Sequence, residues 1–498
     1  MEKSMLRKPP LLVLALFFVL VYLVRAAQAE SVFRVEAGIR QLFLDNVDIE
    51  SIEDLVRTMH PPSKKGAVIR PNWHLGVHAV QLRTAPVWDP EERIYKLWDT
   101  AATPPGLSKT GIGCTGYYES QDGLHWSQPA LGQIEFDLWP KNNYILLLRG
   151  DGRTSRNDYV AYDPHDPDPS RRYKSAHPPH GFAVSPDGRR WRWLDGITGI
   201  PSGDEANFSI DHTKRLYILT VKRTGPNGRS VYLATSEDFV SWTEQGLIFN
   251  ADDHDQAIGK EAIKARFADP TRQQLVANDP SRYNVDVYNM GVFRYESLYI
   301  GTPTMYYATG PSKDNTNTDG FHTVQLTSSR DLKKWERHGN RRPFIDNSRT
   351  ESGAYDLTGI IGPSNAVVRG EELWFYYTSG KYRRAPPRTD PDHLAISLAV
   401  LRRDGFVSLD AGSKGGKVVT KSFTAPAGRL FVNVYAPHGK LNVAALDVDG
   451  NVLARSKSIT GDLARHEVTW RQGKLTAGSQ AQLQFQLENG EFYSYWIE

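Results

Sequence analysis

The chain has 498 residues, 40% of them hydrophobic and 11% aromatic, so it exceeds one ordinary domain and can bury a sizeable core. Its formal net charge at pH 7 is +3, and no run of lysine or arginine marks a surface for nucleic acid or for an anionic membrane. Cys114 is the only cysteine, which excludes an intrachain disulfide. The sequence contains no Cys/His set with the spacing of zinc ligands, so a catalytic zinc is not expected.

The N-terminus has the pattern of a secretory signal. A basic stretch ending at Lys8 is followed by an apolar run, residues 11–24, and then by Ala27-Gln28-Ala29, which fits an A-x-A cleavage site. The apolar run is short for a membrane-spanning helix. We therefore expect residues 1–29 to be a signal peptide, and the mature protein to be near neutral, free of the membrane, and secreted or periplasmic.

A seven-residue phrase recurs along the chain. It places Asp two residues after Ser and Trp four residues after Asp, a pattern typical of strand, tight turn, strand. The copies are SQDGLHW (120–126), SPDGRRW (185–191), SEDFVSW (236–242), SRDLKKW (329–335) and a degenerate fifth, RRDGFVS (402–408). Their intervals are too long for one hairpin and suit a four-stranded propeller blade. We expect each Asp to bond the turn backbone and each Trp to pack between blades.

A second kind of strand, rich in aromatic and aliphatic residues, accompanies these copies. The strands are RIYKLWDT (93–100), RRYKSA (171–176), RLYILTVKR (215–223), SLYIGTPTMYY (297–307) and ELWFYYTSGKY (372–382). Helical periodicity is nearly absent, so the fold class is predicted to be all-β. Residues 30–412 are predicted to form a five-bladed β-propeller, and the short alternating runs of residues 417–498 a C-terminal β-sandwich with a structural or glycan-binding role.

Acidic residues precede the aromatic strands at matching positions. A propeller gathers the starts of its innermost strands around one axis, so these residues should converge on one pocket. They are Asp158, Asp204, Asp286 and Asp356, with His78 in blade one. Carboxyl groups sharing a cavity push their pKa values apart, which leaves one as general acid and another as base or nucleophile, the pair that cleaves glycosidic bonds. We expect Asp204, Asp286 and Asp356 to supply this chemistry and Asp158 to tune it; alternatively, each caps a strand or turn.

Further residues are predicted to bind the sugar. Asn207 follows Asp204 and would bond sugar hydroxyls, while Glu351 would reach the pocket rim. Arg223, Tyr288 and Trp73 would clamp or stack on a sugar ring.

Two acidic stretches have competing interpretations. Asp45 is a weaker pocket candidate, because its N-terminal strand is expected to close the ring of blades and a structural role is the alternative. The DDHD stretch (252–255) is either a structural calcium site with oxygen ligands or a solvated acidic loop. No other cofactor is expected.

Taken together, these features resemble the five-bladed β-propeller glycosidases of glycoside hydrolase families 32, 43 and 68. The resemblance covers residues 40–410, and the tail resembles the β-sandwich that follows the propeller in family 32. It implies an axial pocket with three essential carboxylates from different blades. The family 32 motifs WMNDPNG and Glu-Cys-Pro are missing, and YNMGVFRYESLYIG, where family 43 shows an acidic Glu-Gly-Pro stretch, is preceded by Asp286. The chain therefore resembles a divergent member.

The function expected from the sequence is that of an exported glycoside hydrolase acting on a carbohydrate. A non-catalytic glycan-binding propeller is one alternative. A sialidase-like enzyme is another, since the repeat is similar to the Asp box Ser-x-Asp-x-Gly-x-x-Trp, with its Trp one residue sooner. A propeller-type phosphorylase is the third, and it would need a basic cluster facing the acids. No motif indicates a nucleic acid partner or an oligomeric state.

Overall fold

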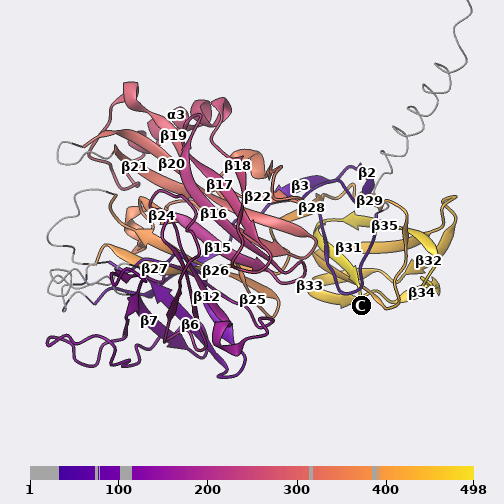
Figure 1. The fold of residues 1–498 in the computed structure, drawn as a ribbon. Coiled ribbons are helices and arrows are strands. Elements are labelled where there is room, and N and C mark those ends of the chain that lie inside the picture. The colour runs from indigo at the N-terminus through magenta and orange to yellow at the C-terminus, as the bar shows by residue number, and fades with distance from the viewer. Residues whose placement is uncertain are drawn as a thin grey trace, which may run out of the picture.

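The computed structural model describes residues 33–72, 74, 77, 79–100, 115–312, 318–383, 390 and 392–498 (Figure 1). The expected signal peptide, Trp73, His78 and Cys114 lie outside the described residues. Within the described part, strands dominate, and none of its helices has the length and apolar character needed to cross a membrane.

Five antiparallel sheets form the blades of a propeller, which confirms the predicted fold class. Blade one consists of β5 (Val87–Asp89), β6 (Ile94–Asp99), β7 (Thr115–Ser120) and β8 (Tyr144–Ile145). Blade two consists of β11 (Tyr159–Tyr162), β12 (Tyr173–His177), β13 (Gly181–Ser185) and β14 (Arg192–Leu194). Blade three consists of β15 (Ala206–Asp211), β16 (Leu216–Gly225), β17 (Gly228–Ser236) and β18 (Thr243–Phe249).

The last two blades each contain a fifth strand. Blade four consists of β19 (Asn284–Tyr295), β20 (Leu298–Pro311), β21 (Thr318–Val324), β22 (Thr327–Ser329) and β23 (Glu336–Arg337). Blade five consists of β24 (Gly359–Ile361), β25 (Val367–Arg369), β26 (Glu372–Gly380), β27 (Leu394–Arg402) and β4 (Ser63–Ile69). A small pair, β9 (Leu147–Leu148) with β10 (Thr154–Ser155), stands apart from the blades.

The ring is closed by β4, which pairs with β27 as the outermost strand of the last blade. The expectation that the segment around Asp45 closes the ring is wrong. That segment runs beside the sandwich instead, where β1 (Gln41–Leu42), β2 (Ile49–Glu53) and β3 (Val56–Met59) pair with C-terminal strands.

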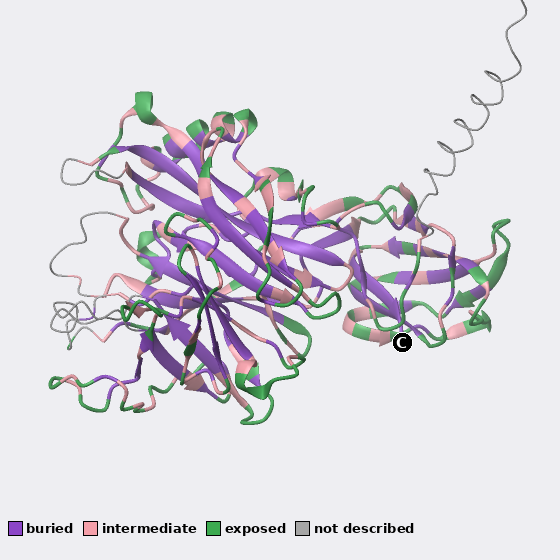
Figure 2. Ribbon diagram, viewed as in Figure 1, coloured by how far each residue is buried: buried purple, intermediate pink, exposed green. Residues whose placement is uncertain are grey.

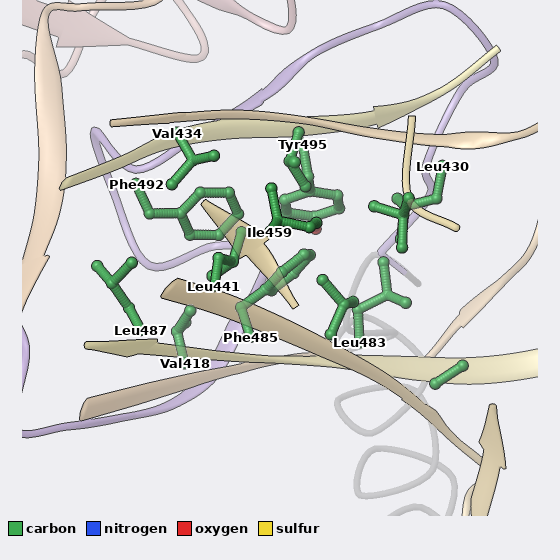
Figure 3. Packing of buried hydrophobic residues seen from close by; sticks show 14 of the residues in the cluster. Val418, Leu430, Val434, Leu441, Ile459, Leu483, Phe485, Leu487, Phe492 and Tyr495 are labelled. Carbon is green, nitrogen blue, oxygen red and sulfur yellow. The ribbon is translucent and has the colours of Figure 1, made fainter. Parts of the chain in front are cut away.

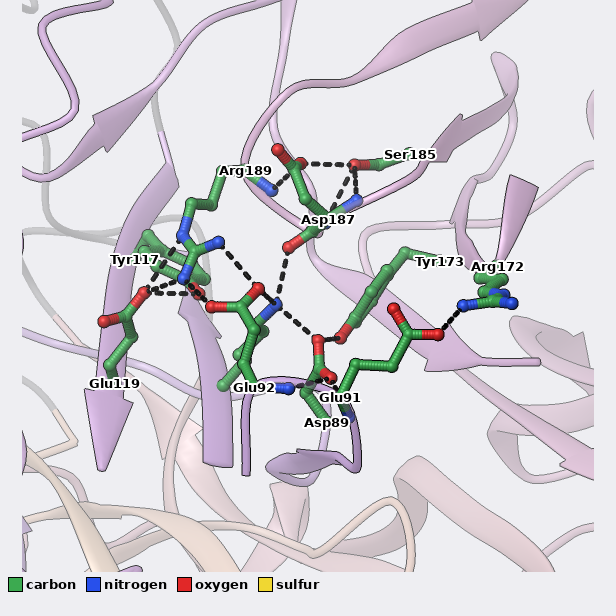
Figure 4. A network of polar contacts seen from close by, with 12 residues as sticks. Asp89, Glu91, Glu92, Tyr117, Glu119, Arg172, Tyr173, Ser185, Asp187 and Arg189 are labelled. Atoms are coloured by element: carbon green, nitrogen blue, oxygen red, sulfur yellow. Dashed lines mark hydrogen bonds and ion pairs between the residues drawn. The ribbon is translucent and has the colours of Figure 1, made fainter. Parts of the chain in front are cut away.

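The recurring Ser-x-Asp phrase forms the same turn in its four full copies. In blade two, the Ser185 Oγ accepts the amide of Gly188, and Asp187 Oδ1 accepts the amides of Arg189 and Arg190, each at 2.8 Å (Figure 4). The residue after Asp has a positive φ in every copy, which explains the glycines in two of them. The matching hydrogen bonds recur at Asp122, Asp238 and Asp331.

The Trp of these copies packs against the preceding blade. Trp191 of blade two meets Trp98 of blade one edge to face, with ring centroids 6.3 Å apart. Trp242 of blade three stacks on Phe182 of blade two at 4.9 Å. The predicted packing between blades is confirmed at these positions, so the repeat belongs to the scaffold.

A second contact between blades comes from the acidic turn after each innermost strand. Asp89 of blade one accepts a hydrogen bond from the Tyr173 hydroxyl of blade two at 2.6 Å (Figure 4). Asp163 accepts one from Tyr217 in the same way, and Asp211 one from Tyr299. These acidic turns therefore tie neighbouring blades together.

Asp89 also anchors Lys96, whose ammonium is fully buried 2.7 Å from the carboxylate. Burial opposes ionisation, but the hydrogen bonds from Lys96 and Tyr173 lower the pKa of Asp89 to about 2. A lowered folded-state pKa stabilises the fold above about pH 4, and this stabilisation is lost as the pH falls toward 2.

Asp89→Asn is expected to lower the free energy of unfolding by about 2 kcal/mol at pH 7, because it weakens charge-assisted hydrogen bonds to a buried ammonium. Urea denaturation at pH 7 and pH 3 checks this, and the difference between variant and wild type should shrink at pH 3. Asp137→Asn, on an exposed turn, is the control and should match wild type at both values. An undiminished difference at pH 3 would contradict the assignment.

The C-terminal sheet curls on itself around a second core. Its remaining strands are β28 (Val407–Ala411), β29 (Gly416–Thr420), β30 (Phe423–Thr424), β31 (Leu430–Leu446), β32 (Val452–Ser456), β33 (Ile459–Glu467), β34 (Trp470–Gly473), β35 (Gln480–Glu488) and β36 (Gly490–Ile497). The long strand β31 pairs with β36 along one part and with β35 along another. Phe485, Phe492 and Tyr495 fill the space between the layers (Figure 3). The propeller strands are largely buried, whereas β32, β33 and β34 of the C-terminal sheet are mostly exposed or half-buried (Figure 2).

The degenerate fifth copy of the repeat joins the propeller to the sandwich. Asp404 is fully buried and accepts hydrogen bonds from Arg40, from Tyr295 of blade four and from Ser494 of β36, at 2.5–2.7 Å. In the other copies the Asp bonds the turn backbone, whereas Asp404 bonds residues of the propeller and of the sandwich.

The DDHD stretch lies at the start of a helix, α3 (Asp253–Ala268), which follows blade three. Asp252 caps the helix and Asp255 completes a capping box. The two carboxylates are ion-paired with Arg341 and Arg337. The interpretation of this stretch as a solvated acidic loop is therefore wrong. In the described part of the chain, no group of three His, Cys, Asp or Glu side chains is placed to hold a metal ion.

Candidate active site at the propeller axis

The starts of the innermost strands bring several acidic residues to matching positions. Asp158 directly precedes β11, Glu205 directly precedes β15, and Asp286 is the third residue of β19. At the opposite end of the same strands, residues of all five blades line a cavity of about 280 Å³. The predicted acids thus lie at the end where the innermost strands begin.

An ion pair crosses the axis at this end. Arg83, from the segment before β5, donates from Nε and Nη2 to the two carboxylate oxygens of Glu205 at 2.5 and 2.7 Å. Both side chains are buried, at 9% and 2% exposure. Blades one and three are not neighbours in the ring, so the pair spans its centre. Such a bidentate arginine holds the Glu205 side chain in a fixed orientation.

Asp158 lies beside this pair with a pKa shifted toward protonation. Burial raises the pKa of Asp158, and the Glu205 charge adds to the rise, while Arg156 and Arg83 oppose it. Its Oδ1 has no hydrogen-bond partner among the described residues, although 18% of the side chain remains exposed. The carboxyl group therefore combines a raised pKa with a buried oxygen that lacks a hydrogen-bond partner among the described residues.

Asp204 has the opposite character. Burial disfavours its charge, but the hydrogen bond and charge of Lys222 prevail and hold the pKa of Asp204 below its ordinary value. Its side chain is 76% exposed, so water reaches the carboxylate. The pKa values of the two acids are thus shifted in opposite directions.

A β-bulge places Tyr288 close to these groups. The register of β19 against β20 shifts between Val287 and Asn289, which makes Tyr288 the extra residue. Its ring lies under the Lys222 ammonium at 4.3 Å. Burial first, and the Glu205 charge second, raise the pKa of Tyr288 to about 12, so its hydroxyl stays protonated.

Asp286 is held from the neighbouring blade. Its Oδ2 accepts a hydrogen bond from Arg229 Nε of β17 at 2.9 Å, whereas Oδ1 has no partner among the described residues. Burial raises the pKa of Asp286 in spite of the Arg229 charge.

His322 of β21 lies against the rings of Tyr288 and Tyr306, with centroids 4.8 and 4.7 Å away. It is 3% exposed, and neither ring nitrogen has a hydrogen-bond partner in the described part of the protein. Burial, followed by the charges of Arg383 and Arg229, holds the pKa of His322 well below its ordinary range. The imidazole is therefore neutral.

Together, these charged and aromatic side chains form a region that we call the axial site: Arg83, Asp158, Asp204, Glu205, Lys222, Arg229, Asp286, Tyr288, Tyr306, His322 and Arg383. Three buried amides accompany them. Asn157, Asn207 and Asn289 are at most 3% exposed, and their side-chain amides lack partners among the described residues. Because buried polar groups normally find a partner, these amides are suited to bonding the hydroxyl groups of a ligand.

Several residues expected at the pocket are bound by partners outside the axial site. Asp356 is buried in blade five, where it pairs with Lys64 at 2.7 Å and accepts from the Tyr377 hydroxyl. Arg223 donates to Glu244 on the outer part of blade three. Asp45 pairs with Arg330 in the turn of blade four.

Glu351 is exposed on a short 3-10 turn, η5 (Thr350–Ser352), and no described contact joins it to the axial site. The placements of Asp158, Asp204, Asp286, Asn207 and Tyr288 agree with a shared site, and their roles remain predictions.

The sequence interpretation missed the cations of the axial site. Lys222 and Arg229 come from the second and third strands of blade three, and Arg383 follows β26. Only the pairing register shows that these side chains meet the starts of the innermost strands. Glu205 could have been predicted from the sequence. It directly precedes β15 and lies two residues before the buried Asn207, so the two side chains share one face of the strand.

No protein-family model matches the chain. No curated protein matches it. Among solved structures, it is similar to a glycoside hydrolase family 43 arabinoxylan arabinofuranohydrolase from Bacillus subtilis, at 9% identity and a TM-score of 0.38, over 87% of this chain and 99% of that one. It is also similar to the family 32 β-fructofuranosidase of Bombyx mori, at 10% identity and a TM-score of 0.40, over 87% and 93% of the two chains.

A third similar structure is described as a glycoside hydrolase, at 13% identity and a TM-score of 0.40, over 69% of this chain and 92% of that one. These neighbours fall in the class that the sequence resemblance named. Their identities and TM-scores are too low to transfer an activity or a substrate, so the function has to be argued from the axial site itself.

Proposed function

We propose that the protein is an exported glycoside hydrolase and that the axial site cleaves the glycosidic bond. The observation that carries this proposal is a pair of acids in one site whose pKa values are shifted in opposite directions by their surroundings. The pKa of Asp158 is raised and the pKa of Asp204 is lowered, which is the division of roles that an acid and a base require.

In this proposal, Asp158 donates its proton to the glycosidic oxygen as the bond to the anomeric carbon breaks. Asp204, ionised and open to water, supplies the negative charge on the other side of the sugar, as base or nucleophile. Burial raises the pKa of Asp158, and the charge of Glu205, which Arg83 holds in place, adds to the rise. The buried amides bind hydroxyl groups and thereby orient the sugar ring.

The proposal is tested by incubating the purified protein with a panel of aryl glycosides and polysaccharides and measuring the sugar released. At least one substrate should be cleaved, and Asp204→Asn should lower kcat by roughly 10²-fold, because the base or nucleophile is lost. Asp137→Asn is the control and should retain full activity. Glycan binding without release from any substrate would contradict the proposal and favour a non-catalytic binding propeller.

A further inference from the structure

The axial site holds four cations and four carboxyl groups, but one of these carboxyl groups, Asp158, is ion-paired with Arg156, which lies outside the four, at 3.4 Å. The cations of the site are Arg83, Lys222, Arg229 and Arg383, and three of them are paired, with Glu205, Asp204 and Asp286 in turn. Among the described residues, no carboxylate lies within ion-pair distance of the fourth, Arg383. One positive charge therefore remains without a protein counter-charge.

Arg383 is held by aromatic rings instead. Its guanidinium lies 5.5 Å from the ring centroid of Tyr306 and 6.0 Å from that of Tyr288. Its buried Nε has no hydrogen-bond partner in the described part of the chain. Arg229 lies 4.6 Å from the centroid of the same Tyr306 ring, so two guanidinium groups lie near one aromatic side chain. A planar guanidinium with free N–H groups is the side chain best suited to an oxyanion.

The neighbouring groups favour an anion that is carried by a sugar. Asn207, Asn289 and His322 are each 3% exposed and present side-chain nitrogens without partners, and these suit hydroxyl groups better than a small free ion. The single uncompensated charge matches a monoanion, such as a carboxylate or a sulfate ester, rather than doubly charged phosphate.

We propose that the axial site selects an acidic sugar, and that Arg383, with Arg229 beside it, binds the carboxylate of a uronic acid or the sulfate ester of a sulfated sugar. This inference rests on the proposed function in that it names the substrate class of the same site. It is tested by binding, which does not depend on whether the bond is then cleaved.

The test is affinity electrophoresis, which measures how far matched polysaccharides in the gel retard the purified protein. One pair is polygalacturonate and its carboxyl-reduced form, and the other is a sulfated galactan and its desulfated form, all at 0.15 M salt to suppress unspecific attraction, about the physiological ionic strength. We expect one acidic polymer to bind about 10-fold tighter than its neutral form, because a charge-assisted hydrogen bond contributes on that order. The pair that shows the difference identifies the anion.

Arg383→Gln should abolish this preference, while Arg383→Lys, which keeps the charge, should retain part of it. The matched control is Arg294→Gln, on the opposite end of β19, which should bind as wild type does. Thermal melting of each variant checks that it is folded.

Equal binding of acidic and neutral polymers, no binding of either pair, or an equal effect of Arg294→Gln would overturn the inference. Acceleration of bond cleavage by inorganic phosphate would also overturn it, because the cations would then serve a phosphorylase. Cleavage of neutral glycans without acidic preference would leave the proposed function intact, whereas acidic preference without cleavage would refute the proposed function alone.

Discussion

Asp158→Asn is expected to lower kcat on a natural glycan by about 10²–10⁴-fold, the usual contribution of a general acid. An amide cannot donate a proton to the departing oxygen, whereas the raised pKa of the carboxyl group keeps that proton available to higher pH than in an ordinary aspartic acid. The loss should be much smaller on an aryl glycoside with an acidic phenol, because such a leaving group departs without protonation.

The dependence of activity on pH should also change in a defined direction. A general acid acts in its protonated form, so wild-type activity should fall on the alkaline side as Asp158 ionises, and the raised pKa moves that fall to higher pH. The lowered pKa of Asp204 places the acidic fall below its ordinary position. In Asp158→Asn, the alkaline fall should vanish. An equal loss of kcat on both kinds of substrate, with the alkaline fall intact, would show that Asp158 is not the acid.

Arg83→Met is expected to lower the free energy of unfolding by about 3–5 kcal/mol, because it leaves the buried Glu205 carboxylate without its partner. Methionine keeps much of the apolar volume of the arginine stem, so the loss measures mainly the charge. Urea denaturation at neutral pH provides the measurement.

The matched control for this pair is the double variant Arg83→Met with Glu205→Gln. Removing both charges should recover much of the lost stability, since no buried charge is then left unpaired. A double variant as unstable as the sum of the two single variants would show that the ion pair across the axis contributes no coupling energy.

The propeller could be predicted from the sequence because its repeating unit is local. Ser185, Asp187 and Trp191 lie within one turn, and their spacing alone specifies the hydrogen bonds that the structure shows. The strand that closes the ring could not be predicted in this way. β4 pairs with β27 from the other end of the chain, and no local signal specifies such a partner.

The candidate site was predicted in part for the same reason. Asp158 and Asp204 lie just before the innermost strands of their blades and Asp286 lies near the start of its own, so the spacing of the repeat pointed to them. Asp356 follows the same spacing, yet the structure binds it to Lys64 within blade five. Arg383 and the other cations were missed, because they come from strands whose register places them at the axis only after folding.

The most direct test of the central claim is a crystal structure of Asp158→Asn with a bound oligosaccharide that the wild-type protein cleaves. The account predicts that the scissile oxygen lies about 2.6–3.2 Å from the residue 158 side chain. It also predicts that Asn207 or Asn289 bonds hydroxyl groups of the sugar. A sugar bound on the C-terminal sandwich, or in the cavity at the opposite end of the axis, would contradict it.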